Sequence, residues 1–157
     1  MKFYTRTLLA QKTILAIGLF VLLGLIVGPV MASDRFVNNG DGTVTDTKTG
    51  LMWSAKDNGN HINWAAARSY CQSYSGGDHT DWRMPTLAEL TSLYDPGVKN
   101  KGGYHITTLI GTTAESCWAS ETRSNEAARF NFNYGQEHWL RQSHSGAGRA
   151  LPVRSGN

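Results

Sequence analysis

The sequence predicts an α+β domain, because two amphipathic helical segments lie between two groups of short strand-like segments. Strand and turn signals fill residues 35–53, and helical periodicity appears between residues 64 and 94. Strand-like segments return from residue 117 onward. We therefore expect two helices and several short antiparallel strands in one domain.

The first strands and the first helix are marked by local signals. A turn rich in Asn and Gly precedes a strand over residues 43–46, and a second turn leads to a returning strand over residues 51–53. Asn63 is placed to cap a helix that runs from Trp64 to about Tyr74, with Cys71 on its buried face. These signals predict a hairpin followed by a helix.

The second helix and the closing strands follow. Thr86 and Glu89 have the spacing of a capping box, so we expect a helix to begin there. The segment after it, residues 98–115, has little periodicity and is interpreted as a long loop. Pro152 cannot donate a hydrogen bond to a neighbouring strand, so the last strand is expected at a sheet edge or a bulge. The expected late strands are residues 117–120, 127–132, 138–141 and 149–154.

The N-terminal residues have the features of an export signal. Three basic residues and no acidic one precede an apolar run over residues 14–28, and Val30-Met31-Ala32 offers a cleavage site of the small-x-small kind. We expect a signal peptide over residues 1–32 and an exported domain over residues 33–157, in the periplasm or at the cell surface. The alternative is an uncleaved signal anchor, which would tether the domain to the membrane through residues 14–31.

The charge of the expected domain is balanced. The whole chain has 15 basic and 12 acidic residues. Three of the basic residues lie within residues 1–32, which leaves twelve basic and twelve acidic residues in the domain. The net charge of the chain therefore gives no argument for nucleic acid as a partner.

The two cysteines, Cys71 and Cys117, are an even number in a chain expected to reach an oxidising compartment. We expect them to form a disulfide bond. Two separate buried thiols are the alternative, because the sequence does not show whether the two α-carbons approach each other.

Four motifs occur in the order in which a known family has them. They are Asn39-Gly40-Asp41-Gly42-Thr43-Val44-Thr45-Asp46 with Thr49-Gly50-Leu51-Met52-Trp53, Asp81-Trp82-Arg83-Met84-Pro85-Thr86 with Glu89-Leu90, Cys117-Trp118-Ala119-Ser120, and Pro152-Val153-Arg154-Ser155-Gly156. On these motifs the sequence resembles a bacterial family of unknown function that includes the C-terminal domain of the Legionella collagen-like adhesin (Lcl). The resemblance covers about residues 35–156.

The resemblance implies a C-type-lectin-like fold, related to that of the formylglycine-generating enzymes, and a role in surface adhesion. We interpret the best-defined motif residues as determinants of the fold. Arg83 is expected to form a hydrogen-bonded fork with backbone carbonyls or with Asp81 or Asp46. These structural signature residues are Trp53, Asp81, Trp82, Arg83, Pro85 and Trp118.

The expected function is that of a non-enzymatic binding module for a carbohydrate or a sulfated or anionic surface polymer. From residue 123 to the end there are five arginines and two acidic residues, and arginine suits bidentate contact with sulfate or carboxylate. The alternatives are a solvated arginine surface, an envelope protein partner without sugar binding and, more remotely, a catalyst like the formylglycine-generating enzymes. The candidate ligand contacts are Arg123, Arg129, Arg141, Trp139 and Tyr134.

No cofactor, metal site or catalytic residue is expected. Neither cysteine has an adjacent His or Lys to lower its pKa, and the five histidines show no short ligand spacing. The turn over residues 38–42 resembles a calcium loop but lacks an acidic residue at Val37. A plain turn is the preferred interpretation there, and calcium is the alternative.

Overall fold

The computed structural model describes residues 34–146 and 148–156. The expected signal peptide or anchor lies outside these residues. None of the helices in the described part of the chain combines the length and apolar character needed to cross a bilayer.

The first sheet joins the two ends of the described chain. It contains β1 (Phe36–Asn38), β2 (Thr43–Asp46), β3 (Leu51–Ser54) and β7 (Val153–Ser155), in the order β1-β2-β3-β7. All three pairings are antiparallel. The predicted hairpin is therefore confirmed as β2 and β3, and β7 lies at the sheet edge as expected for a strand that follows Pro152.

The second sheet is a meander of three antiparallel strands. It contains β4 (Ser116–Arg123), β5 (Glu126–Asn131) and β6 (Gln136–Arg141), and β5 lies in the centre. The register of β4 against β5 shifts between Trp118 and Thr122. Such a bulge bends a strand locally and redirects its side chains.

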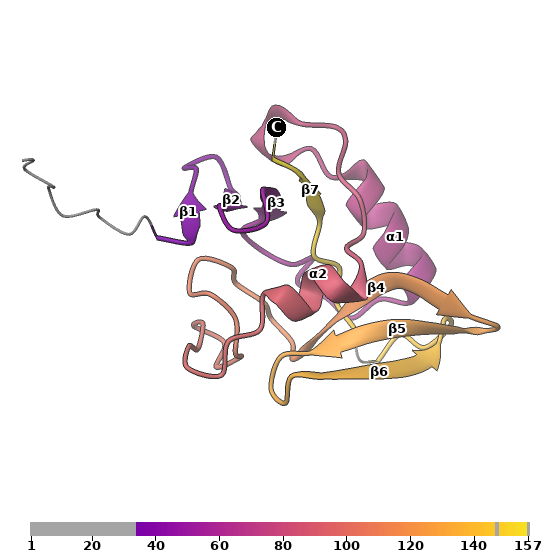
Figure 1. The fold of residues 1–157 in the computed structure, drawn as a ribbon. Coiled ribbons are helices and arrows are strands. Elements are labelled where there is room, and N and C mark those ends of the chain that lie inside the picture. The colour runs from indigo at the N-terminus through magenta and orange to yellow at the C-terminus, as the bar shows by residue number, and fades with distance from the viewer. Residues whose placement is uncertain (1–33, 147, 157) are drawn as a thin grey trace, which may run out of the picture. The chain divides into compact units, whose positions relative to one another are not determined.

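Two helices complete the predicted α+β architecture (Figure 1). α1 (Trp64–Ser73) begins after Asn63, whose side chain accepts a hydrogen bond from the backbone N–H of Ala66. α2 (Leu87–Ser92) begins with the expected capping box. A single 3-10 turn, η1 (Gly76–Asp78), lies between them.

The core has two parts, and the second sheet contributes to both. Because successive side chains of a strand point to opposite faces, Ala128 and Phe130 pack in one cluster while Ala127 packs in the other. The larger cluster includes side chains from α2 and the first sheet, such as Leu90 and Trp53. The smaller cluster lies under α1 and is formed by Ala67, Cys71, Met84, Trp118, Ala127 and Ala150.

Residues 149–156 link the two sheets. The backbone N–H of Trp118 donates to the carbonyl of Arg149 over 2.9 Å, which pairs this segment with β4. Four residues later, Arg83 and Val153 exchange two backbone hydrogen bonds of 2.9 and 3.0 Å, and Val153 also pairs with β3. The chain's last segment therefore holds β4, residue 83 and β3 together.

The indole groups of the signature residues are mostly satisfied, as their structural interpretation requires. Trp118 donates to the carbonyl of Ile62 over 2.9 Å, and Trp82 donates to the carbonyl of Gly76 over 3.1 Å. Trp53 is fully buried, and its indole N–H has no hydrogen-bond partner in the described part of the chain.

The disulfide expected from the sequence is not formed in the described residues: Cys71 and Cys117 are both free, buried thiols. Cys71 belongs to the cluster under α1. Cys117 belongs to the larger cluster on the other face of β4, whereas its neighbour Trp118 faces α1. Strand alternation therefore places the two sulfur-bearing side chains in different parts of the core.

Gly148 offers a direct test of this packing. A Cβ atom at Gly148 would lie 2.7 Å from Cδ1 and Cε2 of the Trp118 indole, which is closer than real Cβ contacts. We expect Gly148→Ala to destabilise the fold by about 1–3 kcal/mol, as overpacking of a core does. Urea unfolding followed by Trp fluorescence measures this change.

The matched control is Gly146→Ala in the same segment, where the nearest heavy atom to an added Cβ is 3.5 Å away. The control should unfold at nearly the wild-type urea concentration. Equal stability of both variants would contradict the packing of Gly148 against Trp118.

Candidate functional site

A cleft of about 500 Å³ opens between α1, the segment of residues 83–86 and β4. We call it the α1–β4 cleft. It combines an aromatic ring, two guanidinium groups, three side-chain hydroxyls and one side-chain amide. The lining residues are Trp64, Arg68, Gln72, Arg83, Met84, Thr86, Ser120 and Thr122.

α1 forms one wall. Trp64, Arg68 and Gln72 are spaced four residues apart, so they lie above one another on one helix face. The Trp64 indole is fixed by a 2.8 Å hydrogen bond from Nε1 to the carbonyl of Ala119. The Arg68 guanidinium lies 5.7 Å from the centre of the Trp64 ring. Arg68 is exposed and forms no ion pair with any residue that the structure describes.

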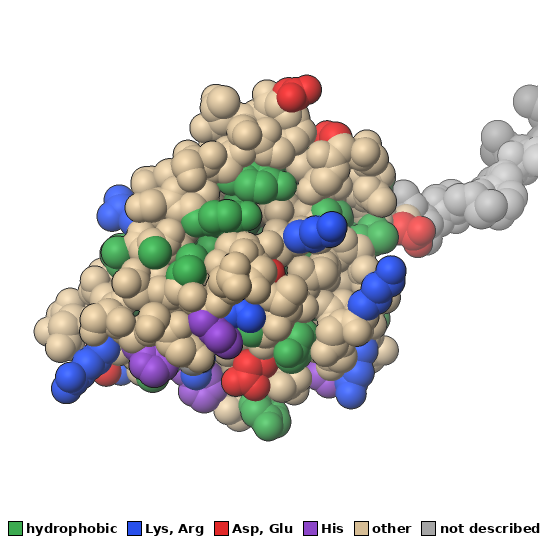
Figure 2. All heavy atoms as spheres, turned by 180° about the vertical axis from the view of Figure 1, so that it is seen from behind, with side chains coloured by type: hydrophobic (Ala, Val, Ile, Leu, Met, Phe, Trp, Pro, Cys, Tyr) green, Lys and Arg blue, Asp and Glu red, His purple; other side chains and the backbone are tan. Residues whose placement is uncertain are grey.

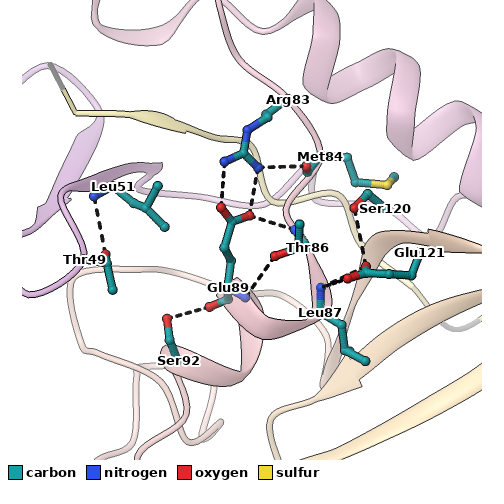
Figure 3. A network of polar contacts seen from close by, with 10 residues as sticks. All are labelled: Thr49, Leu51, Arg83, Met84, Thr86, Leu87, Glu89, Ser92, Ser120 and Glu121. Carbon is teal, nitrogen blue, oxygen red and sulfur yellow. Dashed lines mark hydrogen bonds and ion pairs between the residues drawn. The ribbon is translucent and has the colours of Figure 1, made fainter.

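Arg83 stands on the second wall and forms a bidentate ion pair (Figure 3). Its two terminal nitrogens donate to the two carboxylate oxygens of Glu89 over 2.8 and 2.6 Å. The parallel pair of bonds matches the planar fork of arginine to the planar carboxylate. The positive charge of Arg83 is therefore largely neutralised inside the protein.

The fork was correctly expected, but its acidic partner was not. Asp81 instead accepts a hydrogen bond from Arg154, and Asp46 pairs with Arg35. Glu89 reaches Arg83 because the capping box turns its side chain back over the start of α2. The sequence contained that capping signal, but not the position of Arg83 beside it.

The environment of Glu89 shifts its protonation. Burial alone would raise the pKa of Glu89, but the hydrogen bonds from Arg83 and from the backbone N–H of Thr86 outweigh it and hold the pKa below its ordinary value. The same pairing raises the pKa of Arg83. Both groups stay charged at neutral pH.

β4 forms the third wall, with Ser120 and Thr122 in the cleft lining. Glu121 lies between them in sequence, and both its oxygens accept the backbone N–H of Leu87 at 2.9 Å (Figure 3). Its carboxylate therefore satisfies a free donor in the first turn of α2. Among the residues that line the cleft, Arg68 alone carries a charge without an ion-pair partner.

Three of the ligand contacts expected from the sequence lie together elsewhere, at one end of the second sheet. Arg123 and Arg141 both lie opposite Glu126 in the register of the sheet. Arg123 pairs with Glu126 over 2.8 Å, and its guanidinium lies 4.3 Å from the centre of the Trp139 ring. One face of Trp139 is thus already covered by Arg123.

The other two expected contacts, Arg129 and Tyr134, lie away from this end of the sheet and away from each other. Arg129 lies opposite Trp118 and His138, on the other face of the sheet from Trp139. It is half-buried, and burial lowers its pKa. Tyr134, which is 68% exposed, lies in the turn between β5 and β6, at the opposite end of these strands from Arg141. The five residues do not form one surface.

The two cysteine thiols are buried, and the acidic side chain of the calcium-like turn is already hydrogen-bonded. Burial raises the pKa of the Cys71 thiol to about 12 and that of Cys117 well above its ordinary value. In the turn over residues 38–42, Asp41 accepts hydrogen bonds from the backbone and hydroxyl of Thr43. No group of three or more His, Cys, Asp or Glu side chains in the described part of the chain is placed to hold a metal ion.

The family model described as the Lcl C-terminal domain matches residues 42–154. The match spans most of the chain, and the chain therefore belongs to this family. It also covers every residue that lines the α1–β4 cleft. No match was found among curated proteins.

The Arg83–Glu89 pair predicts how acid affects stability. Because the pKa of Glu89 is depressed in the folded protein, its contribution is present above the ordinary pKa of Glu and is lost as the pH falls through the folded-state pKa. Glu89→Gln keeps an amide that can still cap α2 but loses the charge. We expect wild type to be more stable than Glu89→Gln at pH 7, and the difference to shrink below about pH 4.

Urea denaturation between pH 3 and pH 7 measures the difference. Thr91→Val, at an exposed position of the same helix, controls for general effects on α2. A difference between wild type and Glu89→Gln that stays constant over the whole pH range would contradict the assigned pairing.

Proposed function

We propose that this member of the Lcl C-terminal domain family is an exported, non-enzymatic binding module for an anionic carbohydrate polymer of a surface. Family membership supports a binding role. The export signal and the C-type-lectin-like relationship are expectations from the sequence and belong to the same proposal.

The observation that carries the proposal is the content of the α1–β4 cleft. The exposed guanidinium of Arg68 has no ion-pair partner among the described residues and suits the carboxylate or sulfate of a sugar. The amide of Gln72 and the hydroxyls of Ser120 and Thr122 suit sugar hydroxyls, because they both donate and accept hydrogen bonds. Trp64 adds an apolar surface against which a sugar ring packs.

A non-enzymatic role is supported by the state of the cysteines. A thiol acts as a nucleophile in its thiolate form, and burial makes that form unfavourable at both Cys71 and Cys117. Both side chains are fully buried. An oxidative reaction like that of the formylglycine-generating enzymes has no exposed thiol to start from in this arrangement.

The residues at the end of the second sheet form the alternative binding site to the α1–β4 cleft. Arg123 is neutralised by Glu126 and covers Trp139, so a ligand would first have to displace it to use the ring. Arg141 is exposed and remains a candidate contact there. In the cleft, the Arg68 guanidinium also lies against an aromatic ring, that of Trp64 at 5.7 Å, but it has no acidic partner among the described residues to give up, which is why we place the ligand there.

A second candidate function is the binding of an envelope protein without sugar. A groove of about 500 Å³ borders the edge strand β1 and is lined in part by Phe36, Val98 and Leu109. Val37 of the same strand is 43% exposed. An open strand edge beside apolar side chains is a surface on which an extended peptide can add a strand.

Two matched arginine variants locate the ligand. Arg68→Gln and Arg141→Gln each remove one exposed charge from regular secondary structure. Losing one charge-assisted hydrogen-bonded contact costs about 1.5–3 kcal/mol, so we expect Arg68→Gln to weaken binding at least about tenfold. Arg141→Gln should bind like wild type.

Biolayer interferometry of the folded variants on immobilised polygalacturonate and heparin, at low salt, gives the affinities. Weakening by Arg141→Gln alone would move the site to the end of the second sheet. Absence of wild-type binding to both polymers would contradict the proposed function and leave the edge-strand alternative.

A further inference from the structure

We infer that the ligand of the α1–β4 cleft is a sparsely charged polymer, with about one carboxylate or sulfate on each sugar, and is not a densely sulfated one. The inference rests on the proposed function, because it specifies the chemistry of the ligand for that same cleft. It follows from a count of the charges that the protein leaves unpaired there.

The cleft offers one positive charge to a ligand. Two arginines line it, but Arg83 already holds a carboxylate with both of its terminal nitrogens. Breaking that pair would leave the partly buried Glu89 carboxylate without its partner, which is costly. Arg68 is therefore the charge that an incoming anionic group meets.

Negative charge nearby limits how many anionic groups the cleft accepts. Glu89 and Arg83 neutralise each other, whereas the carboxylate of Glu121 has only the backbone N–H of Leu87 as its main partner and is held in place beside the cleft. A second sulfate close to these walls would be repelled, since like charges brought together in a complex are unfavourable.

The remaining groups of the cleft are neutral and suit hydroxyls. The side chains of Gln72 and Thr122 have no hydrogen-bond partner in the part of the chain that the structure describes, and both are exposed. An amide and a hydroxyl recognise hydroxyl groups of a sugar, whereas a dense polyanion is recognised by clustered Arg and Lys. The composition of the walls thus matches one anionic group surrounded by hydroxyls.

One face of the molecule carries no continuous cationic track for a dense polyanion. Figure 2 shows Lys and Arg side chains as separate spots on that face, with no continuous band. Several arginines also form ion pairs with acidic residues within the fold. The pairs are Arg35–Asp46, Arg123–Glu126, Arg149–Asp57 and Arg154–Asp81.

Three oligosaccharides of equal length test the inference by calorimetry: oligogalacturonate with one carboxylate per sugar, a heparin fragment and a neutral glucan. We expect oligogalacturonate to bind at least about tenfold tighter than the neutral glucan, and Arg68→Gln to abolish that preference. By the salt relation known for nucleic acids, one ionic contact costs only about threefold to fourfold in affinity between 50 and 200 mM salt. The heparin fragment should bind no tighter than oligogalacturonate.

The outcomes distinguish the inference about the charge density of the ligand from the proposed function itself. Tighter binding of heparin than of oligogalacturonate, with a loss of affinity well above tenfold over the same salt range, would overturn the inference and leave the proposed function standing. Equal binding of oligogalacturonate and the neutral glucan would also overturn it. Absence of binding to all three oligosaccharides would overturn both. Arg68→Lys serves as the control, because it keeps the charge and should retain part of the preference.

Discussion

The antiparallel backbone bridge between Arg83 and Val153 is the constraint on which the arrangement of the domain depends. Val153 pairs with β3 and with Arg83, while Arg149, four residues earlier, pairs with β4. These partners lie far apart in the chain, and the last segment brings them together. A further backbone hydrogen bond of 2.8 Å, from the N–H of Ser120 to the carbonyl of Pro85, joins β4 directly to the segment that carries Arg83. Trp118 packs tightly beside Gly148 at the start of this segment. The position of Arg83, and with it one wall of the cleft, follows from this bridge.

The same region shows how a short helix is kept in place. α2 spans only Leu87–Ser92, and so short a helix is unstable by itself. Its first turn is held by the Thr86–Glu89 capping box and by the carboxylate of Glu121 from β4. Glu89 also neutralises Arg83. Glu89 therefore both stabilises the start of α2 and neutralises one of the two arginines that line the cleft. The contacts that hold the helix thus also determine how much positive charge the cleft presents to a ligand.

Local features of this fold could be predicted from the sequence, and features that depend on distant contacts could not. The β2–β3 hairpin, the Asn63 cap and the capping box of α2 each depend on residues a few positions apart. The partner of Arg83 and the cleft itself depend on how α1, residues 83–86 and β4 meet. Trp64 is half-buried, because it both packs against the cluster under α1 and lines the cleft. No local signal distinguishes Arg68 from any other helical surface arginine.

The disulfide prediction failed for a similar reason, because an even number of cysteines does not say which face of β4 Cys117 occupies.

Our central proposal is that an anionic sugar binds beside Arg68 in the α1–β4 cleft. The most direct test is an NMR titration of the ¹⁵N-labelled domain with oligogalacturonate, in which backbone amide shifts map the contact surface. We expect the largest changes at the cleft residues Arg68, Gln72, Ser120 and Thr122. Changes confined to the end of the second sheet, around Arg123 and Arg141, or to β1, would contradict it.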